Sequence, residues 1–204
     1  MKVCAFFVRH GETGLNKEKA FRGPIDVELN EDGRDQAEEL RKFFEDSSFS
    51  SAFTSDKKRT KETAKTVLGN RNIRLKKVKQ LDSYNVGDLA GQPKNAENMA
   101  LVKYYQEHPD ETIPGGESLN QFRKDADPKI MMVIKRGSSS SQPVIAFVHS
   151  SIVHELSYLL HGDHQAIKVR PGGVVAVLKK PNGEYKAVPI LNESKHPDDM
   201  SFGS

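Results

Sequence analysis

The apolar residues of this chain follow two patterns, short continuous runs and longer stretches with helical spacing. Residues 2–8 and 143–148 form nearly uninterrupted apolar runs, which are typical of parallel strands buried on both faces. After Asn30, apolar side chains instead recur at the period of an α-helix, so that one face of the predicted helix is apolar. Because the two patterns alternate along the chain, they indicate an α/β protein.

The remaining expected elements continue this alternation. They are strands at 50–54 and within 73–81, a helix that ends near 68, helices at 95–107, 118–136 and 150–161, and a hairpin of 173–178 with 184–189. We expect Ser55 or Asp56 to cap the helix that ends near 68. Strands alternating with helices predict a three-layer sandwich, in which helices cover both faces of a mostly parallel sheet.

Residues 82–116 interrupt the alternation with glycines and prolines around a short helical piece. We interpret this segment as a small insertion that caps the site. The length of 204 residues fits one domain. We therefore expect a single domain over 1–204, with the insertion at 82–116 and a polar, mobile tail after residue 191.

Charged side chains follow three of the predicted strands. Arg9 and His10 come directly after the first strand, Arg59 lies close behind the second, and His149 follows the strand at 143–148. Sites in such sheets form beyond the carboxyl ends of the strands, so we expect these side chains to converge. Arginine forks match phosphate oxygens, and nearby cations keep an imidazole neutral. The sequence predicts a phosphate site in which His10 attacks phosphorus and His149 stabilises the transition state, with no metal or cofactor.

Composition narrows the classes of function. The chain has 31 basic and 28 acidic residues and shows no basic stripe, which argues against nucleic acid as a partner. No stretch approaches the roughly 18–20 apolar residues of a membrane span. Cys4 is the single cysteine, so no internal disulfide forms, and the start does not look like a secretory signal; both features predict a cytoplasmic protein. The expected partner is a small phosphorylated substrate or a phosphoprotein, and a homodimer stays an open alternative.

The segment VRHGETGLN at 8–16 resembles the Arg-His-Gly-Glu-Thr signature of the histidine phosphatase superfamily, also called phosphoglycerate mutase-like. Later segments resemble further motifs of that family in the same order. They are FRG at 21–23, TSDKKRTKETA at 54–64, PGGES at 114–118 and IAFVHSSIVHEL at 145–156. The signature alone is moderately specific, whereas the ordered set covers almost the whole chain and is strong.

The resemblance implies phosphoryl transfer through a phosphohistidine on His10. It implies that Arg9, Arg59 and His149 hold the phosphoryl group against that histidine. Asn16, from the same loop, would add a side-chain amide to the phosphate pocket. The implied activity is the hydrolysis of phosphate monoesters or phosphoramidates.

The resemblance also implies roles for residues around the phosphate pocket. Arg22 and Gly23 would border the substrate entrance. Glu12 would orient the ring of His10 through a hydrogen bond rather than transfer a proton itself. Ser150 stands where a glycine is common in the family and would lie beside the bound phosphate.

One position departs from the family pattern. Many members carry a glutamate proton donor after the third strand, and Ser83 occupies that place here. A serine is no acid at neutral pH. Asp82 is our first candidate for the proton donor by position, with Asp88 and Glu117 as alternatives, or the enzyme has no acid. Loss of the acid would cost about 10²–10⁴-fold on a poor leaving group.

Two other functions stay open at this stage. A phosphoglycerate-mutase-type phosphotransferase would return the phosphoryl group to its substrate, but the stretch at 84–105 lacks the basic and aromatic residues of those mutases. A weakly catalytic family member that binds a phosphorylated partner is the second alternative, and the serine at position 83 is compatible with it.

Overall fold

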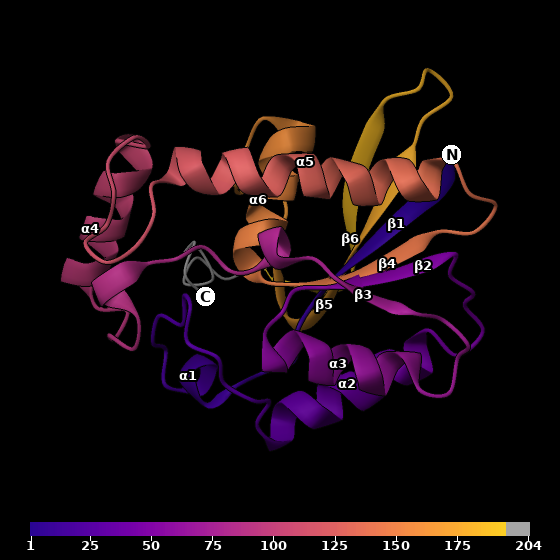
Figure 1. Ribbon diagram of the computed structural model, residues 1–204, viewed down its shortest axis with the longest axis horizontal. Coiled ribbons are helices and arrows are strands. Elements are labelled where there is room, and N and C mark those ends of the chain that lie inside the picture. Colours follow the sequence, from indigo (N-terminus) through magenta and orange to yellow (C-terminus); the bar gives the residue numbers. More distant parts are fainter. Residues whose placement is uncertain (195–204) are drawn as a thin grey trace.

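The computed structural model describes residues 1–194, which contain one six-stranded sheet in the order β3-β2-β4-β1-β5-β6 (Figure 1). The strands are β1 (Lys2–Arg9), β2 (Ser51–Thr54), β3 (Leu75–Lys77), β4 (Val144–Val148), β5 (Val169–Lys179) and β6 (Tyr185–Glu193). β1 to β4 are parallel to one another, and β5 and β6 form an antiparallel hairpin. The predicted mostly parallel sheet is thereby confirmed.

Helices cover both faces of this sheet, as predicted. They are α1 (Gly14–Lys17), α2 (Glu31–Phe43), α3 (Lys58–Leu68), α4 (Ala96–Glu107), α5 (Leu119–Ser138) and α6 (Ser150–His161), with short 3₁₀ helices η1 (Lys79–Leu81) and η2 (Gly87–Leu89). Figure 1 shows α2 and α3 on one side of the strands and α5 with α6 on the other. No helix of residues 1–194 is long and apolar enough to cross a membrane.

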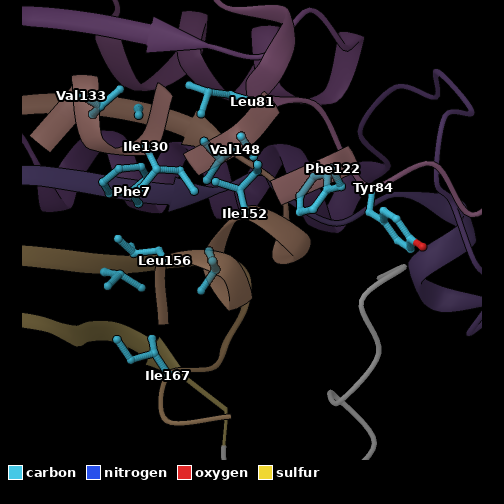
Figure 2. Close-up of a cluster of buried hydrophobic side chains, with 14 of the residues drawn as sticks. Phe7, Leu81, Tyr84, Phe122, Ile130, Val133, Val148, Ile152, Leu156 and Ile167 are labelled. Atoms are coloured by element: carbon cyan, nitrogen blue, oxygen red, sulfur yellow. The ribbon is translucent and has the colours of Figure 1, made fainter. Parts of the chain in front are cut away.

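Alternate residues of the central strands supply two separate cores. Phe7 packs in the core under α5 and α6, whereas its neighbour Val8 packs in the core under α2 and α3. β4 divides its side chains in the same way. Figure 2 shows the first core, where Phe7 and Val148 of the sheet meet Ile130 of α5 and Ile152 of α6. Each such buried side chain contributes about 1.5–3 kcal/mol, which explains the continuous apolar runs.

β1 is the strand that joins the parallel and antiparallel halves of the sheet. It pairs with β4 on one side and with β5 on the other. The same double attachment continues past its end, because the N–H of His10 donates to the carbonyl of Val148 at 3.1 Å and the N–H of Gly172 donates to the carbonyl of His10 at 3.1 Å. The backbone of His10 is therefore fixed from both sides.

Three local expectations need correction. The N-cap residue of α3 is Lys57, not Ser55 or Asp56. The hydroxyl of Ser55 contacts His149 instead, and the carboxylate of Asp26 accepts from the N–H of Lys58 at 2.6 Å. The loop expected after residue 9 contains the one-turn helix α1, and β6 continues two residues past the predicted start of the tail. The rest of that tail, 195–204, lies outside the described residues.

The segment 82–116 leaves the sheet, carries η2 and α4, and returns to its own starting point. At its base the N–H of Asp88 donates to the carbonyl of Pro114 at 2.9 Å. The N–H of Glu117 donates to the carbonyl of Asn85 at 3.2 Å. Gly87 has a φ of +52° and its Cα faces the carbonyl of Pro114, so a side chain there would prevent this approach. Figure 1 places α4 beyond the end of α5, far from the strands. The division into one domain with a cap stays a prediction.

Candidate active site

Three neighbouring parallel strands end at one edge of the sheet, and polar side chains follow each of them. β1 ends at Arg9 and is followed by His10, β2 is followed by Ser55, and β4 is followed by His149. Arg59 lies in the first turn of α3, directly behind β2. Because β2, β4 and β1 are adjacent in the sheet, the structure brings these side chains together as predicted.

His10 is completely buried, and its two ring nitrogens have different surroundings. Nδ1 lies 2.6 Å from the carbonyl oxygen of Gly11, which only accepts, so Nδ1 carries the hydrogen and donates it. Among residues 1–194, Nε2 has no hydrogen-bond partner. Burial, together with the charges of Arg22 and Arg59, lowers the pKa of His10 well below its ordinary value. The ring is therefore neutral and presents a bare lone pair at Nε2.

His149 is also completely buried, and its ring centroid lies 5.3 Å from that of His10. Nε of Arg59 donates to Nδ1 of His149 at 3.3 Å, so this nitrogen carries no hydrogen. Nε2 lies 2.7 Å from Oγ of Ser55 and carries the hydrogen instead. Burial and the charges of Arg59 and Arg22 lower the pKa of His149 well below its ordinary value. The two histidines are thus both neutral but in opposite tautomers.

Three guanidinium groups surround the histidines, and all are buried: Arg9 is 2%, Arg22 1% and Arg59 0% exposed. Arg9 donates to the carbonyl of Val169 at 2.8 Å and Arg59 to that of Ile25 at 2.7 Å. Within residues 1–194, neither Arg22 nor Arg59 forms an ion pair with a carboxylate. Burial lowers the pKa of Arg59 to about 10, so it remains charged at neutral pH. The pocket therefore holds buried positive charge that suits an anion.

The other predicted phosphate contacts lie around this cluster. Gly23, with a φ of +48°, directs its carbonyl towards Nη2 of Arg59 at 3.4 Å. Ser150 is buried and opens α6 directly after His149. Oδ1 of Asn16 accepts from both the N–H and the hydroxyl of Thr13 at 3.1 Å. Asn16 thus braces the signature loop, and its amide nitrogen is the part left for a ligand.

The expected role of Glu12 is wrong in this structure. Its Oε1 accepts from Nδ2 of Asn30 at 2.8 Å, which ties the signature loop to the start of α2. The ring of His10 is oriented by the adjacent carbonyl of Gly11, as described above. Glu12 also acts on Arg22 by its charge, which favours the protonated guanidinium.

Sequence reasoning missed the two hydroxyl residues behind His149. Ser55 was expected only as a helix cap, yet it is fully buried and contacts both His149 and Thr60. The signal was available, because Ser55 follows β2 directly, as His10 follows β1 and His149 follows β4. The strand-end rule therefore applies to it equally.

The family model of the histidine phosphatase superfamily, branch 1, matches residues 5–178. This span is most of the chain and contains both histidines and all three arginines of the site. The chain belongs to the histidine phosphatase superfamily.

Several proteins are similar in sequence to this histidine phosphatase. Fructose-2,6-bisphosphatase TIGAR of Xenopus tropicalis is 36% identical over 124 residues, which are 58% of this chain and 45% of that protein. The chain therefore spans about half the length of the TIGAR relatives that it matches. The uncharacterized phosphatase PhoE of Bacillus subtilis is 29% identical over 156 residues, 76% of this chain and 74% of PhoE.

Solved structures support the fold independently. Mycobacterial glucosyl-3-phosphoglycerate phosphatase in complex with VO3 has a TM-score of 0.76, covering 95% of this chain and 100% of that one. Its sequence is 20% identical, so this likeness concerns the fold. The six-stranded sheet and its helices thus have the same overall architecture as that phosphatase.

A cleft of about 320 Å³ is lined by Pro24, Lys57 and Ser83, among other residues of this histidine phosphatase. Pro24 follows Gly23 along the chain, and Lys57 directly precedes α3, which carries Arg59. Nζ of Lys57 donates to the carbonyl of Pro24 at 3.1 Å. This bond joins the loop at 22–24, which we call the entrance loop, to the start of α3.

The three candidate acids differ in their position relative to the cleft. Asp82 and Glu117 both line it, whereas Asp88 lies outside it in η2. Oδ1 of Asp82 accepts from the N–H of Asp56 at 2.8 Å, and its Oδ2 lies 3.9 Å from Nζ of Lys57. Burial raises the pKa of Glu117, whose Oε1 accepts from the N–H of Asn85 at 2.8 Å. Among residues 1–194, no group of His, Cys, Asp and Glu side chains is arranged to hold a metal ion.

Proposed function

We propose that this protein is a phosphatase that hydrolyses phosphate monoesters or phosphoramidates through a phosphohistidine on His10. The observation that carries the proposal is the bare Nε2 of His10, buried among arginines. No group of residues 1–194 bonds to this nitrogen, so its lone pair is available for attack. An incoming electrophile gives this lone pair a function.

The first step forms a bond between Nε2 of His10 and phosphorus and breaks the bond from phosphorus to the leaving group. Arg9, Arg22 and Arg59 balance the negative charge of the phosphoryl oxygens throughout. The Nδ1–H bond to the carbonyl of Gly11 stabilises the positive charge that develops on the ring. The leaving group departs with the electron pair of the broken bond and takes up a proton.

The second step hydrolyses the phosphohistidine. Water attacks phosphorus, the bond from phosphorus to Nε2 breaks, and the electron pair returns to the ring. The attacking water gives up a proton to the group that protonated the leaving group. Inorganic phosphate then leaves, and His10 is again neutral.

Glu117 is the better placed of the two carboxyl groups in the cleft to supply the proton. Its raised pKa makes a protonated carboxyl available at a higher pH than for an exposed glutamate. Asp82, our first choice by position, is held by the N–H of Asp56 and faces the ammonium of Lys57. These contacts tie both oxygens of Asp82 to the loop before α3.

The substrate that we propose is a small phosphorylated molecule whose leaving group lies in the cleft. Support comes from the relatives named above, whose names describe phosphatases of sugar and glycerate phosphates. The cleft walls carry hydrogen-bonding side chains, including Gln80, Ser83 and Asn85, which suit a polar leaving group. We further propose a cytoplasmic setting, consistent with one buried cysteine, Cys4; the homodimer stays a prediction.

A substrate panel tests this proposal. Purified protein is assayed without added metal on p-nitrophenyl phosphate, an alkyl phosphate and a phosphohistidine peptide. Turnover of all three supports a phosphatase with an acid, and turnover of only the first and last supports one without an acid. Tight binding of the peptide without turnover would favour the phospho-ligand-binding alternative. Isomerisation of 3-phosphoglycerate without phosphate release would favour the phosphotransferase.

A further inference from the structure

A directed chain of hydrogen bonds leads away from the active site through His149. Nε2 of His149 lies 2.7 Å from Oγ of Ser55, and that oxygen lies 2.8 Å from Oγ1 of Thr60. The hydroxyl of Thr60 lies 2.9 Å from the carbonyl oxygen of Lys57. Since a carbonyl only accepts, Thr60 donates to it and Ser55 donates to Thr60. Ser55 is then left to accept from Nε2 of His149.

The opposite edge of the ring imposes the same tautomer. Nε of Arg59 always carries a hydrogen, and it donates to Nδ1 of His149 at 3.3 Å. The lone pair of Nδ1 therefore faces the cationic pocket, and the hydrogen faces Ser55. Both contacts are buried. In the other tautomer, with the hydrogen on Nδ1, water could not replace the two hydrogen bonds that His149 would lose.

This tautomer is unsuited to a phosphate dianion. With ring centroids 5.3 Å apart, a phosphoryl group held against Nε2 of His10 comes within reach of His149. The oxygens of the dianion carry only lone pairs, and Nδ1, which accepts from Nε of Arg59, has no hydrogen to donate to them. A favourable contact requires a hydrogen on that nitrogen.

We propose that Ser55 and Thr60 are positioning residues that hold His149 with its hydrogen on Nε2, so that a phosphate group binds together with one proton taken up at Nδ1. The inference rests on the proposed function, because it assumes that phosphate binds at this site. At high pH the proton comes from solvent. At low pH the phosphate monoanion brings it.

The charges around His149 explain why this uptake waits for the ligand. The groups that act on it are Arg59 from α3, Arg22 from the entrance loop, Lys57 from the start of α3 and Arg9 from the end of β1, and all are cations. They oppose an imidazolium in the empty site. A bound dianion reverses the sign of the local field and favours the charged ring. Ser55 then accepts from Nε2 while Nδ1 donates to phosphate.

Calorimetry with inorganic phosphate measures this coupling directly. The binding heat is recorded in buffers of different ionisation enthalpy, which gives the number of protons taken up per bound phosphate. We expect about one proton at about pH 8, where phosphate is mostly dianionic, and about none at about pH 5. Binding without uptake at the higher pH would overturn the inference. Absence of any binding would instead contradict the proposed function.

Two variants test whether the proton uptake depends on Ser55 and Thr60. Ser55→Ala removes the acceptor for Nε2, so a charged ring would leave a buried N–H unsatisfied; we expect well under half a proton and about ten-fold weaker phosphate binding at about pH 8. Thr60→Ser keeps the hydroxyl chain and should retain the uptake of the wild type. A Ser55→Ala protein that takes up a full proton would refute the role of Ser55.

Nitrogen-15 spectra of the wild type provide a test that does not depend on any variant folding. The free protein should show His10 with its hydrogen on Nδ1 and His149 with its hydrogen on Nε2. Added phosphate should protonate both nitrogens of His149. A free protein with the hydrogen of His149 on Nδ1 would disprove the proposed tautomer.

Discussion

Two groups of ionisable side chains, one buried and one only partly buried, lie on this fold, and they differ in how their charges are balanced. The histidine cluster at the strand ends holds Arg22 and Arg59 without an ion pair to a carboxylate in the described residues. The second group, which we call the acid cluster, consists of Arg123 and Asp127 of α5, Glu155 of α6 and His164 after it. There Nε of Arg123 lies 3.5 Å from Oε2 of Glu155, whose side chain is completely buried.

The pKa values move in opposite directions in the two groups. In the histidine cluster, burial and neighbouring cations lower the pKa of both histidines. In the acid cluster, burial and the charge of Asp127 raise the pKa of Glu155 to about 7, while Arg123 acts against this shift. Buried charge of one sign indicates a site completed by a ligand, whereas in the acid cluster an opposite charge lies beside Glu155 within the protein itself. Four substitutions test this contrast.

The largest effect is expected for His10→Ala. Removal of the nucleophile should lower turnover of p-nitrophenyl phosphate by at least about 10³-fold, because no phosphohistidine can form. The melting temperature should change little, since the imidazole makes a single hydrogen bond within residues 1–194. His108→Ala, on the surface beside Tyr104, is the matched control and should keep full activity. Activity near the wild-type rate in His10→Ala would remove the basis of the proposed mechanism.

Arg59→Gln should reduce turnover by about 10²–10³-fold, because it removes a charge that the transition state needs. It should also abolish the increase in melting temperature that phosphate produces in the wild type, which thermal unfolding with and without phosphate measures. Arg71→Gln is the control, because Arg71 lies just after the C-terminal end of α3 and donates to the carbonyl of Val67. Equal stabilisation by phosphate in Arg59→Gln and wild type would place the anion elsewhere.

The third substitution, Glu117→Gln, addresses the proton donor. We expect a loss of about 10–10²-fold on an alkyl phosphate and a small change on p-nitrophenyl phosphate, whose leaving group needs no proton. Asp82→Asn is the comparison, and steady-state rates on both substrates decide between the two carboxyls. Should Asp82→Asn show the selective loss and Glu117→Gln none, the first choice by position would be restored.

The smallest effect on activity is expected in the acid cluster. Because the pKa of Glu155 rises from an ordinary value of about 4.5 to about 7 in the folded protein, its contribution is fully present below about pH 4.5 and is lost as the pH rises through about 7. As the pH rises from about 5 to about 8, the free energy of unfolding should therefore fall by about 2 kcal/mol less in Glu155→Gln than in the wild type. The melting temperature should accordingly fall by roughly 5 °C less. Turnover should stay within about two-fold.

Thermal unfolding across this pH range measures the difference in slope. Glu107→Gln, an exposed pair with Lys103 on α4, is the control and should parallel the wild type. Identical slopes for Glu155→Gln and wild type would show that the acid cluster is not under electrostatic strain. A large loss of turnover would show that the two clusters are coupled.

The sequence predicted the parts of the site that depend on neighbouring strands. His10 and His149 each follow a continuous apolar run, Arg59 lies close behind the short strand at 50–54, and such strands are recognisable without coordinates. The partner of Glu12 was not predictable in this way, because Asn30 lies 18 residues further along the chain and only packing brings the two together. The same holds for Asp26, which accepts from the start of α3. Periodicity defines elements, whereas contacts between loops depend on how the elements pack.

The double attachment of His10 has a consequence for the order in which the protein is made. His10 is synthesised well before the two backbone groups that fix it, which belong to Val148 and Gly172. At about 5–20 residues per second, many seconds of synthesis separate these events. A nascent chain that stops before β4 therefore carries the ring of His10 without the backbone partners that hold it in place.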